Sequence, residues 1–277
     1  MKSKILRVLS VLVAAYLSVL VCIYFNQSNL LYFPDKDTGQ ISDYNLGDTK
    51  EIFLTSADGA KIQTWVHNPK GHKPMVIWLH GNSYNLAQRK EKFRELIKMG
   101  YGLIAPSWHG FGKSEGKPGI KEIYDDARAA INYLQQLGYK TEDTIIIGES
   151  LGSGVAVQMA VEHRFKEVFL ITPYTSIADR AQEIYWYLPV KQLVTDNFES
   201  YDKIDRIDAP LLIVHGDKDD VIPHSHAEKL YAKALEPKKL IIYPGKGHSN
   251  LDINVIFTEM ANFTKTSETD GKEVTHK

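Results

Sequence analysis

Apolar and polar positions follow two patterns along the chain, which are short apolar runs and longer stretches with helical spacing. The runs have the length of strands and the stretches that of helices. We expect strands at 51–56, 61–67, 75–79, 101–106, 144–147, 168–171, 211–214 and 239–243. We expect helices at 86–99, 120–137, 151–163, 224–235 and 253–263. Strands that alternate with helices predict an α/β domain whose mostly parallel sheet has helices on both faces.

This alternation is interrupted at 178–209, where aromatic residues are frequent and no strand pattern is visible. We interpret this stretch as a short lid inserted beside the carboxyl edge of the sheet. The globular domain as a whole is expected to cover residues 49–264. The polar residues 265–277 after it are expected to be a disordered tail.

The beginning of the chain has a different pattern, because residues 5–25 are almost wholly apolar and are interrupted only by Arg7 and two serines. A helix of this length rises about 30 Å, which is about the thickness of a bilayer core. We therefore expect an N-terminal membrane anchor at 1–25, followed by a polar linker at 26–48.

Basic residues lie at the front of this anchor, at Lys2, Lys4 and Arg7. The positive side of a membrane helix stays cytoplasmic, so the rest of the chain is expected on the far side, in the periplasm, the lumen or the exterior. A cleaved signal peptide is the alternative. Its apolar region is usually shorter and ends in small residues at an A-x-A-like site, whereas here the apolar run continues well past Val13-Ala14-Ala15.

Length and composition fit one large domain with appendages, since the chain has 277 residues, of which 43% are hydrophobic. The formal net charge of -1 gives no electrostatic reason to expect a nucleic-acid partner. Cys22 is the single cysteine, which excludes an intrachain disulfide and zinc sites built on cysteine pairs. We expect no metal and no organic cofactor.

The sequence Gly148-Glu149-Ser150-Leu151-Gly152 matches the motif G-x-S-x-G. The pentapeptide is weak evidence by itself, but it directly follows the expected strand at 144–147 and opens the expected helix at 151–163. A sharp turn between strand and helix holds a serine hydroxyl out at the top of the sheet in α/β-hydrolase folds. We therefore predict that Ser150 is a nucleophile.

A serine hydroxyl needs a base, which in this fold lies downstream of an acid in the order Ser, Asp or Glu, His. His248 follows the strand at 239–243 in a glycine-rich loop and is the candidate base. The acid is expected after the strand at 211–214, where Asp217, Asp219 and Asp220 compete. Spacing alone does not choose between these three aspartates.

Stabilising the negative charge of a tetrahedral intermediate requires backbone N–H groups. One is expected from Leu151, the residue after the nucleophile, and the other from Asn82 in the loop after the strand at 75–79. His80 in the same loop is interpreted as a structural histidine.

Seven motifs in this order resemble the short-lid, membrane-anchored α/β-hydrolase domain proteins, and the resemblance covers residues 30–263. The motifs are LYFP at 31–34, HGN at 80–82, GFGKSEG at 110–116, GESLG at 148–152, PYTS at 173–176, APLLIVHG at 209–216 and GH at 247–248. The resemblance implies that Asp219 is the acid, because the family places it three residues after the glycine of a His-Gly pair. Two departures, at 82–84 and 108–110, could reshape the acyl or leaving-group pocket.

The family's members are mostly described as esterases, thioesterases or lipases, and some relatives carry peptidase labels. We therefore expect a membrane-anchored serine hydrolase of carboxylic esters or thioesters, with a small-molecule or lipid ester as substrate. An amidase or peptidase on the same triad is one alternative, for which Glu149 and Glu183 could bind an amine. A non-catalytic binding module is a second. A metal site from His224, His226 and 217–220 is a third, which the diverging side chains of a His-x-His pair on a helix disfavour.

Overall fold

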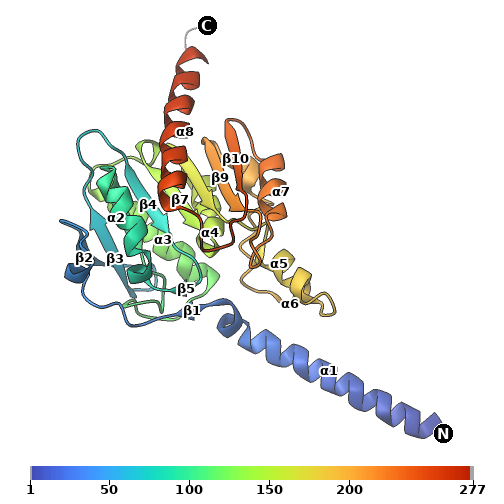
Figure 1. The fold of residues 1–277 in the computed structure, drawn as a ribbon. Helices are drawn as coiled ribbons and strands as arrows, with labels where there is room; N and C mark the ends of the chain where they lie inside the picture. Colours follow the sequence, from blue (N-terminus) through green and yellow to red (C-terminus); the bar gives the residue numbers. More distant parts are fainter. Residues whose placement is uncertain (1, 275–277) are drawn as a thin grey trace.

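An eight-stranded sheet forms the centre of the molecule in the computed structural model, which describes residues 2–274 (Figure 1). The strand order is β10-β9-β8-β7-β4-β6-β3-β2. All pairs from β10 to β6 are parallel, and β3 and β2 extend the sheet as antiparallel strands. The strands are β2 (Lys50–Thr55), β3 (Lys61–His67), β4 (Met75–Leu79), β6 (Gly102–Pro106), β7 (Ile145–Glu149), β8 (Glu167–Ile171), β9 (Leu211–Gly216) and β10 (Lys238–Tyr243). The predicted α/β fold with a mostly parallel sheet is confirmed.

Helices cover both faces of this sheet, and each face has its own hydrophobic cluster. One cluster lies beneath α3, α4 and α7, and the other beneath α2 and α8. Successive strand residues point to opposite faces, so that Ile77 of β4 belongs to the first cluster and Trp78 to the second. The helices are α2 (Lys90–Lys98), α3 (Ile120–Gln136), α4 (Leu151–Glu162), α7 (Ser225–Lys233) and α8 (Ile253–Val274).

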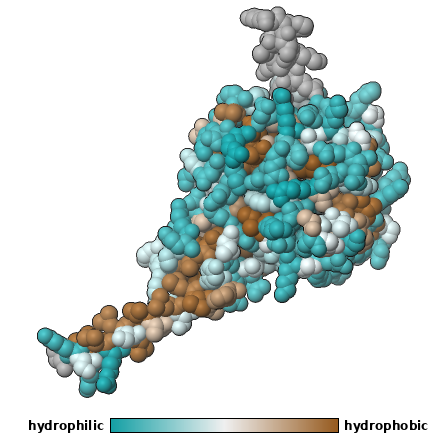
Figure 2. Space-filling model, turned by 180° about the vertical axis from the view of Figure 1, so that it is seen from behind, coloured by the Kyte–Doolittle hydropathy of each residue, from teal (hydrophilic) through white to brown (hydrophobic). Residues whose placement is uncertain are grey.

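The longest helix, α1 (Lys2–Leu31), extends away from the rest of the molecule (Figure 1). It is an apolar surface that continues up to the globular body (Figure 2). Within the described part of the chain, α1 is the single helix long and apolar enough to cross a membrane. The first six residues of the expected linker are helical, because α1 ends at Leu31 instead of residue 25.

After α1 the chain forms a short strand that the hydrophobic pattern does not reveal. Strand β1 (Phe33–Pro34) pairs in parallel with β5 (Ser83–Tyr84), which lies in the loop after β4. This pairing attaches the chain that follows the N-terminal helix to a loop at the carboxyl edge of the main sheet.

The segment between β8 and β9, which interrupts the alternation of strands and helices, contains α5 (Ile177–Ile184) and α6 (Val190–Leu193). A short 3₁₀ turn follows at Ile204–Arg206. We call residues 177–196 the lid. Large apolar side chains at its tip, including Trp186 and Tyr187, are exposed.

Residues 265–274 of the expected tail belong to a helix, because α8 continues to Val274. The first half of α8 packs Ile256, Phe257 and Met260 into the core. Extending a helix that is already nucleated needs only one further hydrogen bond per residue. Residues 275–277 lie outside the described residues.

Candidate active site

Ser150 lies between the last residue of β7 and the first residue of α4, with φ 51° and ψ -118°. A positive φ is rare for a residue with a side chain, and such strain occurs preferentially at functional sites. The N–H of Ser150 donates to the carbonyl of Ile171 at 2.9 Å, which holds this strained turn against the neighbouring strand β8.

Both glycines of the motif are required by close packing around this turn. A side chain at Gly148 would collide with the backbone of Gly152 and Ser153. A side chain at Gly152 would collide with the carbonyl group of Leu79 at the end of β4. The motif therefore lets α4 start directly against the carboxyl end of the sheet.

Ser150, His248 and Asp219 are brought together in one hydrogen-bonded line. Nε2 of His248 lies 3.1 Å from Oγ of Ser150, and Nδ1 lies 2.7 Å from Oδ2 of Asp219. The loop after β10 supplies the histidine and the loop after β9 supplies the aspartate. With a proton on Nδ1 donated to Asp219, Nε2 is free to accept a proton from the serine hydroxyl.

Asp219 is the one of the three competing aspartates that contacts His248. Its second oxygen, Oδ1, accepts hydrogen bonds from the N–H groups of Val221 and Ile222 at 2.9 and 2.8 Å. Burial alone would raise the pKa of Asp219, but hydrogen bonds from His215, His248 and the Ile222 N–H lower it below the usual range.

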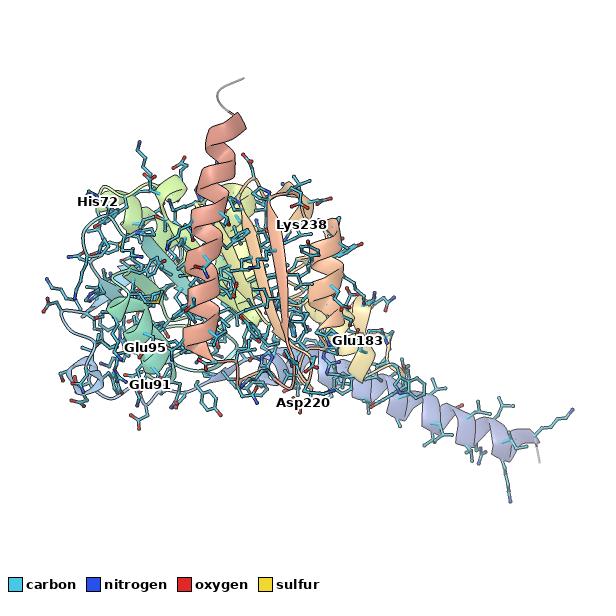
Figure 3. The ribbon with its side chains drawn as sticks, turned by 45° about the horizontal axis from the view of Figure 1, so that its top comes forward. His72, Glu91, Glu95, Glu183, Asp220 and Lys238 are labelled. Carbon is cyan, nitrogen blue, oxygen red and sulfur yellow. The ribbon has the colours of Figure 1, made fainter. Side chains whose placement is uncertain are left out.

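The other two aspartates are placed elsewhere. Oδ1 of Asp217 accepts from the N–H of Gly245 at 2.6 Å and thereby holds the loop that carries His248. Asp220 is exposed and lies at the edge of the molecule (Figure 3).

His215 is a residue of this site to which the sequence analysis assigned no role. It is fully buried at the end of β9, and its Nε2 lies 3.0 Å from Oδ2 of Asp219 and 2.8 Å from the carbonyl oxygen of Ile222. The His-Gly pair in the sequence marks its position, but a strand residue gives no sign of which group its ring will contact.

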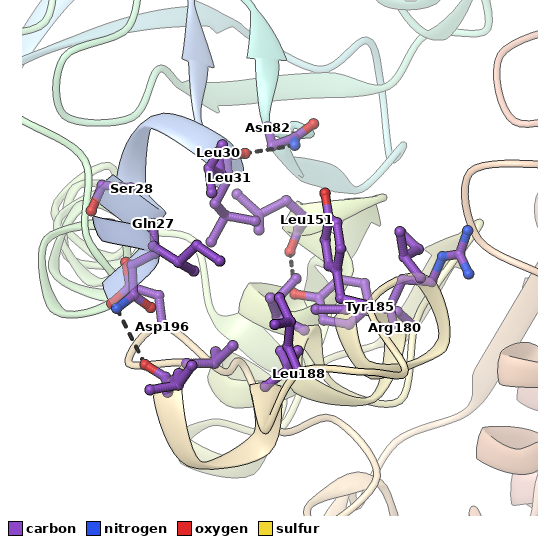
Figure 4. A pocket seen from close by; sticks show the side chains of 18 of the residues that line it. Gln27, Ser28, Leu30, Leu31, Asn82, Leu151, Arg180, Tyr185, Leu188 and Asp196 are labelled. Atoms are coloured by element: carbon purple, nitrogen blue, oxygen red, sulfur yellow. Dashed lines mark hydrogen bonds between the residues drawn. The ribbon is translucent and has the colours of Figure 1, made fainter. Parts of the chain in front are cut away.

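The loop after β4, which carries Gly81 and Asn82, lies beside Ser150. Gly81 lies so close to Ser150 that an added Cβ would be 3.4 Å from the serine Cβ. The side chain of Asn82 donates to the carbonyl of Leu31 at 2.7 Å (Figure 4). The backbone carbonyl of Asn82 accepts from the N–H of Phe33 at 2.8 Å. Both contacts leave the Asn82 N–H without a hydrogen-bond partner among the described residues.

Leu151 begins α4 next to Ser150, and the first N–H groups of a helix have no partner within the helix. Leu151, Asn82 and Ser150 all line the same cavity. The structure thus brings together all five residues that the sequence analysis selected.

His80 has the structural position expected of it. It is fully buried, and its Nε2 accepts from the N–H of Trp108 while Nδ1 lies 2.7 Å from the carbonyl oxygen of Gly81. Burial and the nearby charge of Arg89 lower the pKa of His80 to about 3. His80 is therefore neutral and fixes the loop that carries Asn82.

The cavity beside Ser150 has a volume of about 480 Å³. Its wall is formed by the end of α1, the lid and the first residues of α4 (Figure 4). Two charged side chains of the described chain, Arg180 and Asp196, line it among otherwise neutral residues. Asp196 is engaged by the hydroxyl of Tyr32, which donates to it at 2.6 Å.

The residues considered for metal binding do not converge. Buried His226 contacts Thr175 through Nδ1 and Glu183 through Nε2, whereas His224 lies near Glu228. The described residues contain no group of three or more histidine, cysteine or acidic side chains that could hold a metal ion.

The chain is similar in sequence to known proteins. Residues 70–201 and 190–252 match the sequence model of a family described as serine aminopeptidase, S33. An uncharacterized protein of Mycobacterium tuberculosis is 31% identical over 207 residues, which are 74% of each chain. Human alpha/beta hydrolase domain-containing protein 17B is 30% identical over 210 residues, which are 74% of this chain and 72% of the human protein.

Solved structures with a similar fold include esterases. An esterase of Pyrococcus furiosus superposes with a TM-score of 0.70 and 20% identity, covering 85% of this chain and 97% of the esterase. Est1E of Butyrivibrio proteoclasticus, solved with ferulic acid bound, superposes with a TM-score of 0.64 and 21% identity, covering 78% and 98%. At these identities the likeness establishes the fold.

Proposed function

Since the chain belongs to the serine aminopeptidase S33 family of the α/β-hydrolase superfamily, we propose that it is a serine hydrolase that cleaves carboxylic esters or thioesters. One observation carries this proposal, which is the hydrogen-bonded line from Ser150 through His248 to Asp219 on a strained turn. Nucleophile, base and orienting acid then lie in the order that acyl transfer requires.

The first half of the reaction forms an acyl-enzyme. Oγ of Ser150 attacks the substrate carbonyl while Nε2 of His248 takes the hydroxyl proton. Asp219 stabilises the resulting imidazolium through Nδ1–H. The N–H groups of Asn82 and Leu151 donate to the oxyanion of the tetrahedral intermediate. As this intermediate collapses, His248 returns the proton to the leaving alcohol or thiol.

Water completes the cycle. His248 removes a proton from a water molecule, whose oxygen attacks the acyl carbonyl, and the same two N–H groups stabilise the second oxyanion. Collapse releases the carboxylic acid and returns the proton to Ser150. All proton transfers use groups of this chain, so the proposed reaction needs no metal and no cofactor.

The proposed location of this chemistry is a membrane surface. Apolar helix α1, with Lys2, Lys4 and Arg7 at its front, supports a single-pass anchor whose N-terminus is cytoplasmic and whose catalytic domain lies on the far side. The membrane and a small-molecule or lipid ester are then the partners of the chain, and nucleic acid is not.

An amidase or peptidase on the same triad is the second candidate, favoured by the description of the matching family. An aminopeptidase needs a group that recognises the substrate's positive amine. Glu149 is paired with Lys92, and Glu183 contacts Arg180 and His226, so both expected carboxylates are already engaged. The apolar cavity therefore supports an acyl substrate better than a peptide.

Ester hydrolysis by the full chain in vesicles, measured with p-nitrophenyl esters and with the matching anilides, tests the proposal. We expect turnover of esters that Ser150→Ala lowers at least 10³-fold. Ser153→Ala is the matched control, because this serine lies one turn away in α4 and is buried outside the hydrogen-bonded line. Anilide turnover that exceeds ester turnover would favour the amidase, and folded protein without either activity would favour a binding module.

A further inference from the structure

Helix α1, the proposed membrane anchor, contacts the globular body through one of its faces. The partly buried residues near its end are Leu20, Ile23, Gln27 and Leu31, while most of their neighbours are exposed. Positions three and four apart lie on the same face of a helix. This face is turned toward the lid and the cavity beside Ser150, which Ile23, Gln27 and Leu31 line.

Polar contacts fix the end of α1 to the lid. Nε2 of Gln27 donates to the carbonyl of Leu193 at 3.2 Å, and its Oε1 accepts from the N–H of Thr195 at 2.9 Å. The side-chain amide of Gln27 therefore bridges helix and lid with both of its polar atoms, and Figure 4 shows it beside the lid at the cavity. Nearby, the hydroxyl of Tyr32 donates to Asp196.

The same helix end also holds the loop that carries Asn82. The carbonyl of Leu31 accepts from the Asn82 side chain, and the N–H of Phe33, which follows the helix, donates to the backbone carbonyl of Asn82. A helix that served only as a tether would not need to contact either the lid or this loop. Here the end of α1 contacts both the lid and the loop of Asn82, and all three line the cavity.

The level of the cavity relative to a bilayer follows from helix geometry. If residues 5–25 span the apolar core, Gln27 to Leu31 lie about 3–9 Å beyond its edge at 1.5 Å per residue. Tyr185, Trp186 and Tyr187 at the lid tip are exposed, and tyrosine and tryptophan prefer the membrane–water interface. Helix end, cavity and lid tip thus all belong at the membrane surface.

We propose that this cavity binds the acyl chain of a lipid ester or thioester, which enters from the bilayer between α1 and the lid. In this account α1 is a wall of the binding site as well as an anchor. The inference rests on the proposed hydrolase function, whose ester it identifies as a membrane lipid or lipid-modified molecule. A volume of about 480 Å³ and an almost wholly neutral lining fit such a chain.

Matched substitutions on one helix test the wall. Ile23→Trp places an indole on the cavity side, and Val21→Trp places it on the opposite side, where Val21 is 56% exposed. In full-length protein in vesicles we expect Ile23→Trp to lower the ratio of kcat/KM for p-nitrophenyl palmitate to that for the acetate at least tenfold. Val21→Trp should leave this ratio unchanged. Equal ratios for the two variants would overturn the proposal.

A second pair tests the opposite wall, with Ala181→Phe in the lid and Ala232→Phe on the exposed side of α7 as its control. We expect the same loss of long-chain preference for Ala181→Phe alone.

The route of entry is tested with the position of the substrate. A palmitate ester placed in the protein's own vesicles should be cleaved at least tenfold faster than the same ester in separate vesicles. Equal rates would overturn access from the bilayer and indicate a soluble acyl donor.

Binding without catalysis separates this inference from the proposed function. A photoreactive palmitic acid in vesicles with the Ser150→Ala protein should label residues 177–194 saturably. Labelling should fall at least tenfold when Ile23→Trp is added and remain when Val21→Trp is added. This result would support binding of an acyl chain in the cavity even if no ester were hydrolysed. Lid labelling that is unchanged by both substitutions would overturn it.

Discussion

Single residues determine the chemistry of the site. Asp219 uses both carboxylate oxygens, one for two backbone N–H groups and the other for His248 and His215. These donors lower the pKa of Asp219, so that it stays ionised at neutral pH. An ionised acid keeps His248 in the tautomer with its proton on Nδ1.

Replacing this acid by its amide should therefore reduce turnover while the protein stays folded. We expect Asp219→Asn to lower kcat for a short p-nitrophenyl ester by about 10²–10⁴-fold with a small change in KM, because the amide does not fix the tautomer. Asp220→Asn is the matched control and should stay within about threefold, since Asp220 is exposed. Equal losses in both variants would remove Asp219 from its proposed role.

The residues of the site could be selected from the sequence to different extents. Ser150 and His248 could be selected because each follows an apolar strand in a motif whose spacing is local. The choice among three neighbouring aspartates depends on loop geometry, which spacing does not contain. His215 was missed for the same reason. Tyr84 adopts φ 65°, which is uncommon for a residue with a side chain, and no local pattern indicates this.

At the scale of elements, strand β8 and helix α8 meet around a buried carboxyl group. Glu167 begins β8 and is fully buried, and the hydroxyl of Thr264 on α8 donates to its Oε2. Its Oε1 has no hydrogen-bond partner among the described residues. Burial raises the pKa of Glu167 to about 8, although the Thr264 hydrogen bond opposes this.

The raised pKa predicts a pH dependence of stability. The folded state favours the protonated form of Glu167. The contribution of this group to the free energy of unfolding is therefore full below about pH 4.5 and is lost as pH rises through about 8. Glu167→Gln keeps the shape and removes the ionisation. We expect similar Tm values for variant and wild type near pH 5 and a variant that is several °C more stable at pH 9.

Thermal unfolding of the full chain in detergent at pH 5, 7 and 9 measures this difference. Glu142→Gln, a substitution at an exposed glutamate, is the control and should follow the wild type at each pH. A wild type that is as stable as Glu167→Gln at pH 9 would show that the ionised carboxylate finds compensating contacts there.

Most elements of the domain could be predicted because apolar runs and helical spacing are local properties of the sequence. Strands β1 and β5 could not be predicted, because each has two residues and their pairing depends on the position of α1. The continuation of α8 to Val274 was missed because polarity suggested disorder, whereas a helix already anchored in the core needs little more to extend.

For the whole molecule, the proposed membrane anchor α1 carries a testable orientation, with the N-terminus cytoplasmic and the site on the far side. In a Cys22→Ser background, a membrane-impermeant maleimide applied to intact cells should label Ser42→Cys in the domain but not Ser3→Cys before the helix. Both positions are exposed in the folded chain. The reverse pattern would contradict the proposed orientation, and a mature protein that lacks residues 1–25 by mass would indicate a signal peptide.

Covalent labelling of the nucleophile tests the proposed serine hydrolase most directly. Full-length protein is treated with a fluorophosphonate, and the modified residue is identified by mass spectrometry. We expect a single adduct on Ser150, absent from Ser150→Ala and present in Ser153→Ala, with labelling slowed at least 10²-fold in His248→Ala. Folded wild-type protein that forms no adduct, or forms an adduct on another serine, would exclude Ser150 as the nucleophile.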